Sequence, residues 1–188
     1  AAGIHWPVWD GAAWSYDGNV DAPGYSPPYP KVSLMDPNGI RHLFYAGSGT
    51  GNIGAPWYTQ IAQDASNTAP VKQVVGSKVF NGVVVGSDLV FAASASPGGA
   101  SWGYPGVYRV SPYNSASPTI TLTEIATPED QYISDGCCMV KDGSNLYLIF
   151  TAISIPPAWD VETVVLYYYK STDGGVTWGP ATLIYDVL

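Results

Sequence analysis

Two acidic residues hold the positions best suited to acid–base chemistry in this sequence. Cleavage of a glycosidic bond needs two facing carboxyl groups, one of them protonated. Asp135 directly precedes an apolar run at residues 137–140, and Glu162 closes a Pro-containing loop before the run at 164–169. We therefore name Asp135 and Glu162 as candidate catalytic residues. The alternative for each is an ordinary solvated loop acid.

Aromatic residues recur at the wide loops of the chain. Trp57, Trp102 and Trp159 each lie in, or directly after, a Gly/Pro-rich loop that leads to an apolar run. Tyr58 and Tyr104 lie close by. Aromatic planes at the rim of a pocket stack on the apolar faces of sugar rings, so these five residues are candidate ligand-binding residues. The alternative is that each tryptophan holds its own loop against the body of the protein.

Strands must position these residues, because apolar spacing typical of long helices is nearly absent. Three segments share one order of elements: residues 31–75, 76–127 and 128–188. In each, a short strand and a tight polar turn lead to a strongly apolar strand. A Gly/Pro-rich loop then leads to a third strand and a weaker fourth strand. Residues 1–30 form an aromatic and Pro-rich segment before these units.

The spacing of the units favours a β-propeller-type fold made of four-stranded blades. Leu43, Leu89 and Leu148 hold equivalent places and lie 46 and 59 residues apart, near the roughly 40 to 50 residues of a blade. In the third unit, Leu148 and Phe150 alternate with the equally apolar Ile149. A sheet that is apolar on both faces lies between neighbours. A β-sandwich is the alternative.

Three blades do not close a propeller, which typically has four to eight. We therefore expect an incomplete propeller, or one that is completed by self-association or by a partner chain.

The most specific motif runs from Ser171 to Trp178. It reads Ser-Thr-Asp-Gly-Gly-Val-Thr-Trp and resembles the Asp-box, or BNR repeat, of sialidase-like β-propellers at four positions: Ser171, Asp173, Gly175 and Trp178. In that family the hairpin is structural and faces away from the active site. Locally, an aspartate accepts backbone N–H bonds across such a turn while glycines take positive φ. The resemblance implies a carbohydrate-recognising fold and gives Asp173 no catalytic role.

The sequence also departs from that family. Sialidases hold the substrate carboxylate with three arginines, whereas this chain has only Arg41 and Arg109, each inside a strand pattern. A complete sialidase is therefore not expected. We expect a carbohydrate-recognising, sialidase- or glycosidase-like propeller. Whether it is a glycoside hydrolase acting through paired carboxylates is left open by the sequence; the alternative is a non-catalytic glycan-binding, structural or surface-assembly repeat module.

No cofactor or metal is expected. The two histidines, His5 and His42, form no metal-binding pattern, and the adjacent Cys137 and Cys138 lack metal-site spacing. These cysteines are either two thiols or a vicinal disulfide.

The charge of the chain excludes some partners. Seven basic and fifteen acidic residues give a net charge of −8, which argues against binding to nucleic acid because phosphate contacts need clustered cations. Apolar runs are far shorter than the roughly 20 residues that cross a bilayer. The composition resembles that of secreted carbohydrate-active proteins, so we expect an extracellular protein whose partner is a glycan.

Overall fold

The fold is known from a computed structural model that describes most of the chain. The described residues are 3–9, 14–21, 29–46, 57–61, 72–73, 78–95, 104–125, 131–154 and 163–186. All regular structure within these ranges is β-strand, and no helix occurs in them. The prediction of an all-β fold is therefore confirmed for this part of the chain.

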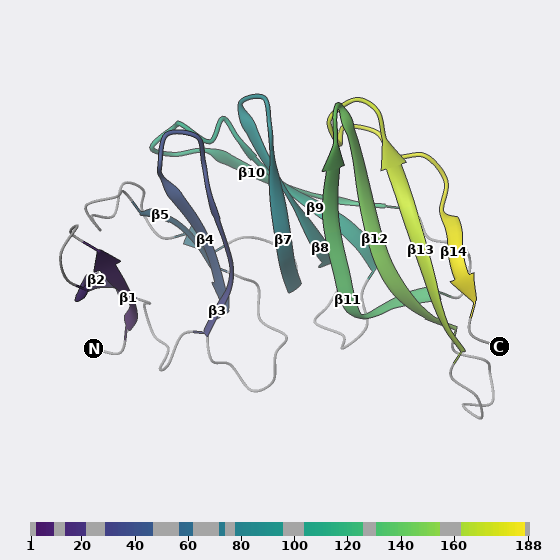
Figure 1. The fold of residues 1–188 in the computed structure, drawn as a ribbon, viewed down its shortest axis with the longest axis horizontal. Coiled ribbons are helices and arrows are strands. Elements are labelled where there is room, and N and C mark those ends of the chain that lie inside the picture. The colour runs from purple at the N-terminus through teal and green to yellow at the C-terminus, as the bar shows by residue number, and fades with distance from the viewer. Residues whose placement is uncertain are drawn as a thin grey trace.

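The strands form three four-stranded antiparallel sheets and one hairpin, and none of the sheets closes on itself (Figure 1). The hairpin consists of β1 (Gly3–Trp9) and β2 (Trp14–Asp21). The first sheet consists of β3 (Tyr29–Met35), β4 (Arg41–Ala46), β5 (Trp57–Ile61) and β6 (Lys72–Gln73). The second consists of β7 (Lys78–Val85), β8 (Asp88–Ala95), β9 (Tyr104–Ser111) and β10 (Thr119–Glu124). The third consists of β11 (Gln131–Asp142), β12 (Asn145–Ser154), β13 (Thr163–Ser171) and β14 (Thr182–Asp186).

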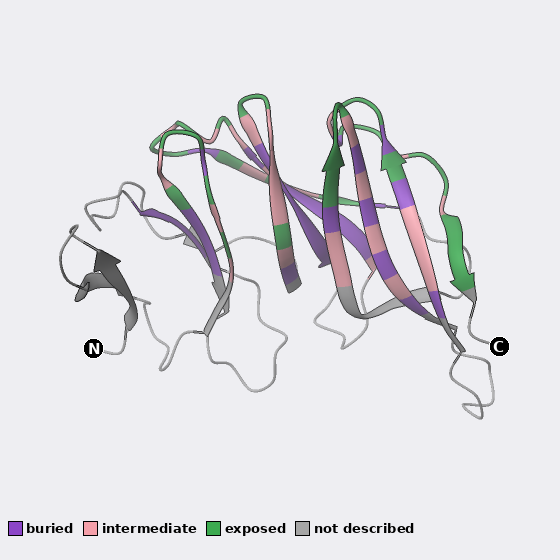
Figure 2. Cartoon of the chain, viewed as in Figure 1, coloured by how far each residue is buried: buried purple, intermediate pink, exposed green. Residues whose placement is uncertain are grey.

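Within each sheet the strands follow one another in sequence order, so every connection joins neighbouring strands. The sheets stack face to face, and the second is buried on both sides (Figure 2). Along β8, Leu89 and Phe91 belong to the core shared with the first sheet, whereas Val90 and Ala92 belong to the core shared with the third. Alternate side chains of a strand point to opposite faces. Consecutive apolar residues of β8 therefore pack against a neighbouring sheet on each face of the second sheet.

Aromatic rings fill the space between the first and second sheets. Phe44 is fully buried, and its ring centroid lies 4.9 Å from that of Phe91, 5.1 Å from that of Tyr58 and 5.5 Å from that of Tyr108. Such tilted and edge-on arrangements add to the stability gained from burial alone. This cluster fixes the first sheet on the second.

Aliphatic and aromatic side chains fill the space between the second and third sheets. Leu146, Leu148 and Phe150 of β12 are buried there, and the Phe150 ring stacks on Tyr169 with centroids 5.1 Å apart. Val90 and Ala92 meet them from the second sheet. The third sheet thus has one covered face toward the second.

The tight turns share one edge of the stack. The β3–β4, β7–β8 and β11–β12 turns all lie at the upper edge in Figure 1, together with the β9–β10 and β13–β14 connections. Because each second strand runs away from this edge, the third strands β5, β9 and β13 begin at the opposite edge. We call the first the turn edge and the second the loop edge.

The first strands of the sheets are neighbours and share an irregularity. β7 lies beside both β3 and β11. The pairing register of these strands shifts between Pro30 and Val32, between Val79 and Gly82, and between Ile133 and Cys137. Bulges of this kind bend a strand and re-aim its side chains.

Polar side chains tie neighbouring sheets together by reaching backbone atoms. Asn81 of β7 accepts a hydrogen bond from the Met139 amide and donates one to the Met139 carbonyl, both at 2.7 Å. Lys141 Nζ donates to the Val84 carbonyl at 2.9 Å. Side chains thus supply the polar links at this junction between β7 and β11.

Candidate functional site

Two of the predicted binding residues, Trp57 and Tyr104, lie at the loop edge. Trp57 is the first residue of β5 and Tyr104 the first residue of β9, so both lie where the third strands begin. Tyr104 is half-buried. Trp102 and Trp159 lie outside the described residues, as does the side chain of Trp57.

The two candidate catalytic residues are only partly covered by the structure. Asp135 lies in β11, within the interval between Ile133 and Cys137 where the pairing with β12 is irregular. Nothing is described of its side chain, and Glu162 lies outside the described residues. Their mutual distance therefore stays a prediction.

Tyr58 has a different environment from the one expected of a rim residue. It pairs directly with Phe44 across β4 and β5, and directly paired side chains share a face. That face is turned toward the second sheet, so the ring is 1% exposed. Tyr58 therefore belongs to the core and has no free face to offer a ligand.

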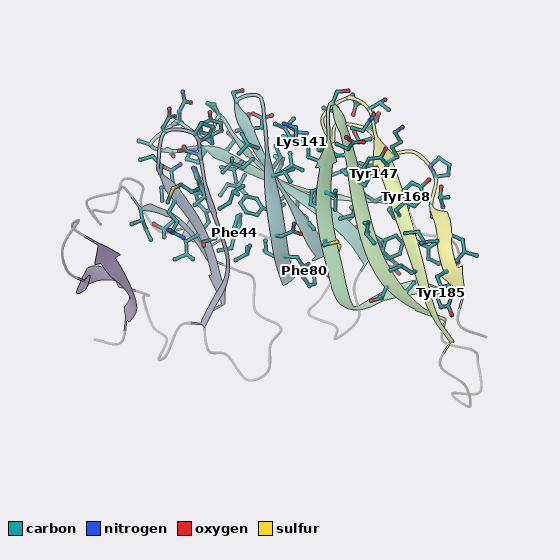
Figure 3. All side chains as sticks on the ribbon, viewed as in Figure 1. Phe44, Phe80, Lys141, Tyr147, Tyr168 and Tyr185 are labelled. Atoms are coloured by element: carbon teal, nitrogen blue, oxygen red, sulfur yellow. The ribbon has the colours of Figure 1, made fainter. Side chains whose placement is uncertain are left out.

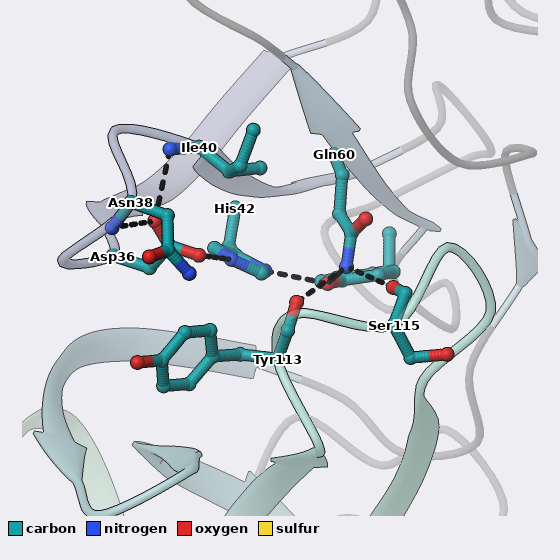
Figure 4. A network of polar contacts seen from close by, with 8 residues as sticks. Asp36, Asn38, Ile40, His42, Gln60, Tyr113 and Ser115 are labelled. Carbon is teal, nitrogen blue, oxygen red and sulfur yellow. Dashed lines mark hydrogen bonds and ion pairs between the residues drawn. The ribbon is translucent and has the colours of Figure 1, made fainter.

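A buried polar network surrounds the Tyr58 hydroxyl (Figure 4). His42 Nδ1 lies 2.6 Å from the hydroxyl, and His42 Nε2 lies 3.3 Å from Asp36 Oδ2. Gln60 Nε2 donates to the Tyr58 hydroxyl at 3.1 Å. The same amide nitrogen lies 3.1 Å from the carbonyl oxygens of Tyr113 and Ser115, in the connection between β9 and β10. The network therefore joins the first sheet to the second.

One arrangement of protons satisfies this network. The Asp36 carboxylate only accepts, so His42 Nε2–H is donated to it and the neutral Nδ1 accepts the phenol proton of Tyr58. The two N–H groups of Gln60 are shared among the Tyr58 oxygen and the Tyr113 and Ser115 carbonyls. Asp36 Oδ1 meanwhile accepts the backbone amides of Asn38 and Ile40, at 2.8 and 2.9 Å. His42 is the neutral tautomer in this arrangement.

Burial favours the neutral form of both His42 and Tyr58. Loss of water around His42 lowers the pKa of its imidazole, although the hydrogen bond to Asp36 opposes this. Burial also raises the pKa of the Tyr58 phenol. Asp36, His42 and Tyr58 have the residue types of a proton relay, but each is at most 4% exposed. A substrate cannot reach them, so the network stabilises the fold.

The 171–178 loop, between β13 and β14, is organised by one carboxylate. Asp173 Oδ1 accepts the backbone amides of Val176 at 3.0 Å and Thr177 at 2.9 Å, while Thr177 Oγ1 donates to Oδ2. Ser171 Oγ donates to Asp173 and accepts the Gly175 amide at 2.8 Å. These hydrogen bonds hold the pKa of Asp173 below its usual range, led by that from the Thr177 hydroxyl. The carboxylate is fully engaged within the loop, which indicates a structural role.

Two glycines let the 171–178 loop turn against the core. Gly174 and Gly175 have φ values of +71° and +84°, which other residues rarely adopt. A Cβ atom on Gly175 would lie only 3.1 Å from Leu146 Cδ1. Trp178 is half-buried against the core between the second and third sheets. The loop is therefore packed on the third sheet at its turn edge.

Arg109 joins the second sheet to this loop. Its guanidinium forms an ion pair with Asp88, and its Nη2 donates to the Gly174 carbonyl at 2.7 Å. Arg109 lies in β9, and Arg41 opens β4. Arg41 Nη1 donates to Ser33 Oγ at 3.2 Å. These contacts give both arginines partners within the fold.

The adjacent cysteines are free thiols in this structure. Cys137 pairs with Phe150 and Cys138 with Ile149, so consecutive positions of β11 place them on opposite faces of the third sheet. Burial raises the pKa of both thiols, with a smaller contribution from Cys138 at Cys137. Raised pKa values keep thiols protonated and poorly nucleophilic.

Sequence reasoning missed His42 and Gln60 as the centre of a polar network. His42 lies in β4 and Gln60 in β5, each inside an uninterrupted run of buried residues, 42–44 and 58–61. That pattern marks a buried hydrogen-bonding side chain. The sequence shows these polar residues beside apolar ones, but it does not indicate which groups their side chains contact.

In the described ranges, no group of three or more His, Cys, Asp and Glu side chains is arranged to hold a metal ion. Those ranges also contain no helix of the length and apolar character needed to span a membrane. Comparisons with protein-family models, curated proteins and solved structures found no match to the chain.

Proposed function

We propose that this chain is part of a β-propeller-type protein, similar to sialidase-like proteins, that recognises carbohydrate at the loop edge. Three four-stranded antiparallel sheets in sequence order, stacked face to face with neighbouring first strands, support the proposal. Further sheets, from a second copy or a partner chain, complete the ring. Few basic residues and many aromatic ones are typical of extracellular carbohydrate-active proteins, and we propose that location.

The observation that carries the proposal is the common edge at which the third strands begin. Trp57 opens β5, Trp102 precedes β9 by two residues and Trp159 precedes β13 by four. The proposal therefore puts these tryptophans near the loop edge, because two to four residues span at most about 7 to 14 Å. Aromatic rings gathered at one rim are suited to stacking on sugar rings.

In the catalytic form of the proposal, Asp135 and Glu162 act as acid and base or nucleophile at this edge. Retaining and inverting hydrolysis require carboxyl groups about 5 to 10 Å apart. The bulged part of β11 that contains Asp135 supports this form, because bulges often re-aim side chains near active sites.

Recognition without hydrolysis is the second candidate. The acidic side chains described in most detail, Asp36, Asp88 and Asp173, are engaged in hydrogen bonds at the turn edge. None of these three is free to act as an acid or base on a sugar.

Glycan-array binding with tryptophan variants tests the proposal. Trp57→Ala, Trp102→Ala and Trp159→Ala are each expected to weaken binding at least about ten-fold, because aromatic stacking supplies much of the affinity for a sugar. Met35→Ala is the control, since Met35 is 48% exposed at the end of β3 and lies at the turn edge, away from the proposed site. Unchanged glycan binding in all three tryptophan variants would refute the proposal of carbohydrate recognition at the loop edge.

Release of reducing sugar from any bound glycan separates the two forms. Asp135→Asn and Glu162→Gln abolish release but retain binding if the protein is a hydrolase. Binding without release by the unaltered protein selects recognition alone.

A further inference from the structure

A second surface feature lies away from the loop edge, on the third sheet. A groove of about 460 Å³ lies between β13, the 171–178 loop and the start of β14. Six residues provide most of its chemistry: Tyr168, Lys170, Thr172, Thr177, Trp178 and Thr182. A groove of this volume is within the range of small-ligand sites.

The groove lies at the face of the third sheet that turns away from the second. Leu148 and Tyr169 form a pair whose side chains lie in the core shared with the second sheet. Tyr147 and Lys170 form the next pair, so their side chains lie on the opposite face. Figure 3 shows Tyr147 and Tyr168 side by side on this sheet, and their ring centroids are 5.8 Å apart.

Lys170 is the described charged residue of the groove, and its ammonium has no oxygen partner among the residues that the structure describes. Among the described basic side chains, Arg41, Arg109 and Lys141 each donate to an oxygen atom. The Lys170 Nζ instead lies over the Tyr147 ring, 5.7 Å from its centroid. Within the described ranges, its charge is therefore not neutralised by an ion pair or a hydrogen bond.

The charge of the groove is opposite to that of the chain. The sequence has a net charge of −8, yet the described residues that line the groove include no acidic one. The nearby Asp173 is bound to Thr177 and the loop amides. A cation left unpaired in these surroundings suits an anionic ligand.

The other lining groups favour a sugar as the carrier of that anion. Three threonines line the groove beside the aromatic Tyr168 and Trp178. Hydroxyl groups match the hydrogen-bonding groups of sugars, and aromatic surfaces match their apolar faces. A phosphate-rich ligand is disfavoured, because strong phosphate binding uses several cations or a bidentate arginine.

We propose that this groove binds a saccharide carrying a carboxylate, such as a uronate residue, with Lys170 facing the carboxylate. The 171–178 loop supports the site because its hydrogen bonds fix one wall before the ligand arrives. The site is separate from the loop edge and does not depend on the tryptophans proposed to bind there.

Calorimetric titration with tetragalacturonate, and with its fully methyl-esterified form, tests the proposal. The ester has the same sugar rings without the negative charges. We expect the acid to bind at least about five-fold more tightly than the ester at low ionic strength, and the preference to shrink as salt is added.

Variants then assign the preference to the groove. Lys170→Gln is expected to remove it and Lys170→Arg to retain it. Lys141→Gln is the matched control, because it changes the net charge equally at a second exposed lysine on the same sheet. Trp102→Ala leaves tetragalacturonate binding unchanged, which separates this site from the loop edge.

Three results would overturn the proposal. One is equal affinity for the acid and the ester, or no binding of either at millimolar concentration. Another is an equal loss in Lys170→Gln and Lys141→Gln, which would indicate attraction to overall charge. The third is sedimentation showing a dimer that Tyr168→Lys dissociates, because a second copy would then cover the groove.

Discussion

Removing the hydroxyl of Tyr58 is a direct test of the buried network between the first and second sheets. In Tyr58→Phe the ring still fills the same space beside Phe44, so the change is confined to hydrogen bonding. The hydroxyl makes two contacts, to His42 Nδ1 at 2.6 Å and to Gln60 Nε2 at 3.1 Å. Gln60 keeps its two carbonyl acceptors, whereas His42 Nδ1 loses the partner seen here.

The expected loss follows from these contacts. A buried hydrogen bond contributes a net stability of about 1 kcal/mol, and a buried polar group left without a partner costs about 1–3 kcal/mol. We therefore expect the free energy of unfolding to fall by about 2–3 kcal/mol. With a denaturant slope of about 2–3 kcal/mol/M, the urea midpoint falls by about 1 M.

Urea unfolding followed by tryptophan fluorescence measures this loss, and Tyr147→Phe is the control. Tyr147 is half-buried on the third sheet and lies outside the network, so its variant is expected to change stability by less than about 0.5 kcal/mol. Equal midpoints for Tyr58→Phe and Tyr147→Phe would refute the reasoning. An unchanged denaturant slope in both variants shows that only stability has changed.

Two further predictions concern pH and the turns. The pKa of His42 is lowered in the folded protein, so the unfolded chain binds the proton more readily, and stability falls as the pH drops below about 6.5. Unfolding at several pH values should show a shallower fall in His42→Gln than in the unaltered protein, and parallel curves would contradict this. Gly175→Ala should lower the free energy of unfolding more than Gly86→Ala. Both glycines have positive φ, but a new Cβ meets Leu146 at 3.1 Å in the first case and open space in the second; equal thermal shifts would contradict the packing argument.

The strands could be predicted from the sequence because their patterns are local. The apolar strand at residues 42–45 is observed as Arg41–Ala46, and the strand at 89–92 as Asp88–Ala95. The alternation of Leu148 with Ile149 indicated a sheet with two apolar faces, but only one of those faces is covered in the structure. A local sequence pattern predicts how apolar a sheet face is. Which element covers that face depends on contacts between residues that are far apart in the chain.

The role of Tyr58 could not be predicted from its position next to Trp57. Sequence proximity to a loop suggested a rim, but pairing with Phe44 sets the direction of the side chain. Its hydroxyl contacts His42 of β4 and Gln60 of β5, and Gln60 in turn reaches the Tyr113 and Ser115 carbonyls in the β9–β10 connection. Which polar groups meet in a core depends on register and on sheet stacking, and neither is visible in a local run of residues.

The groove was missed for a related reason. Lys170 and Thr182 are separated by the 171–178 loop, and they meet because β13 pairs with β14. The sequence motif drew attention to the loop itself, whose hydrogen bonds lie within eight residues. It carried no sign of the surface that the loop borders.

The polar links between sheets have an evolutionary consequence. In each link the side chain comes from one sheet and the partner atom is backbone on the next, as for Asn81 with Met139, Lys141 with Val84, Arg109 with Gly174 and Gln60 with Tyr113. A mutation on the backbone side alters the side chain but leaves the bonded amide or carbonyl in place. Each link thus depends on the identity of a single side chain. Neighbouring sheets can accumulate substitutions independently, and a duplicated sheet can be accepted beside an existing one without matched changes in both.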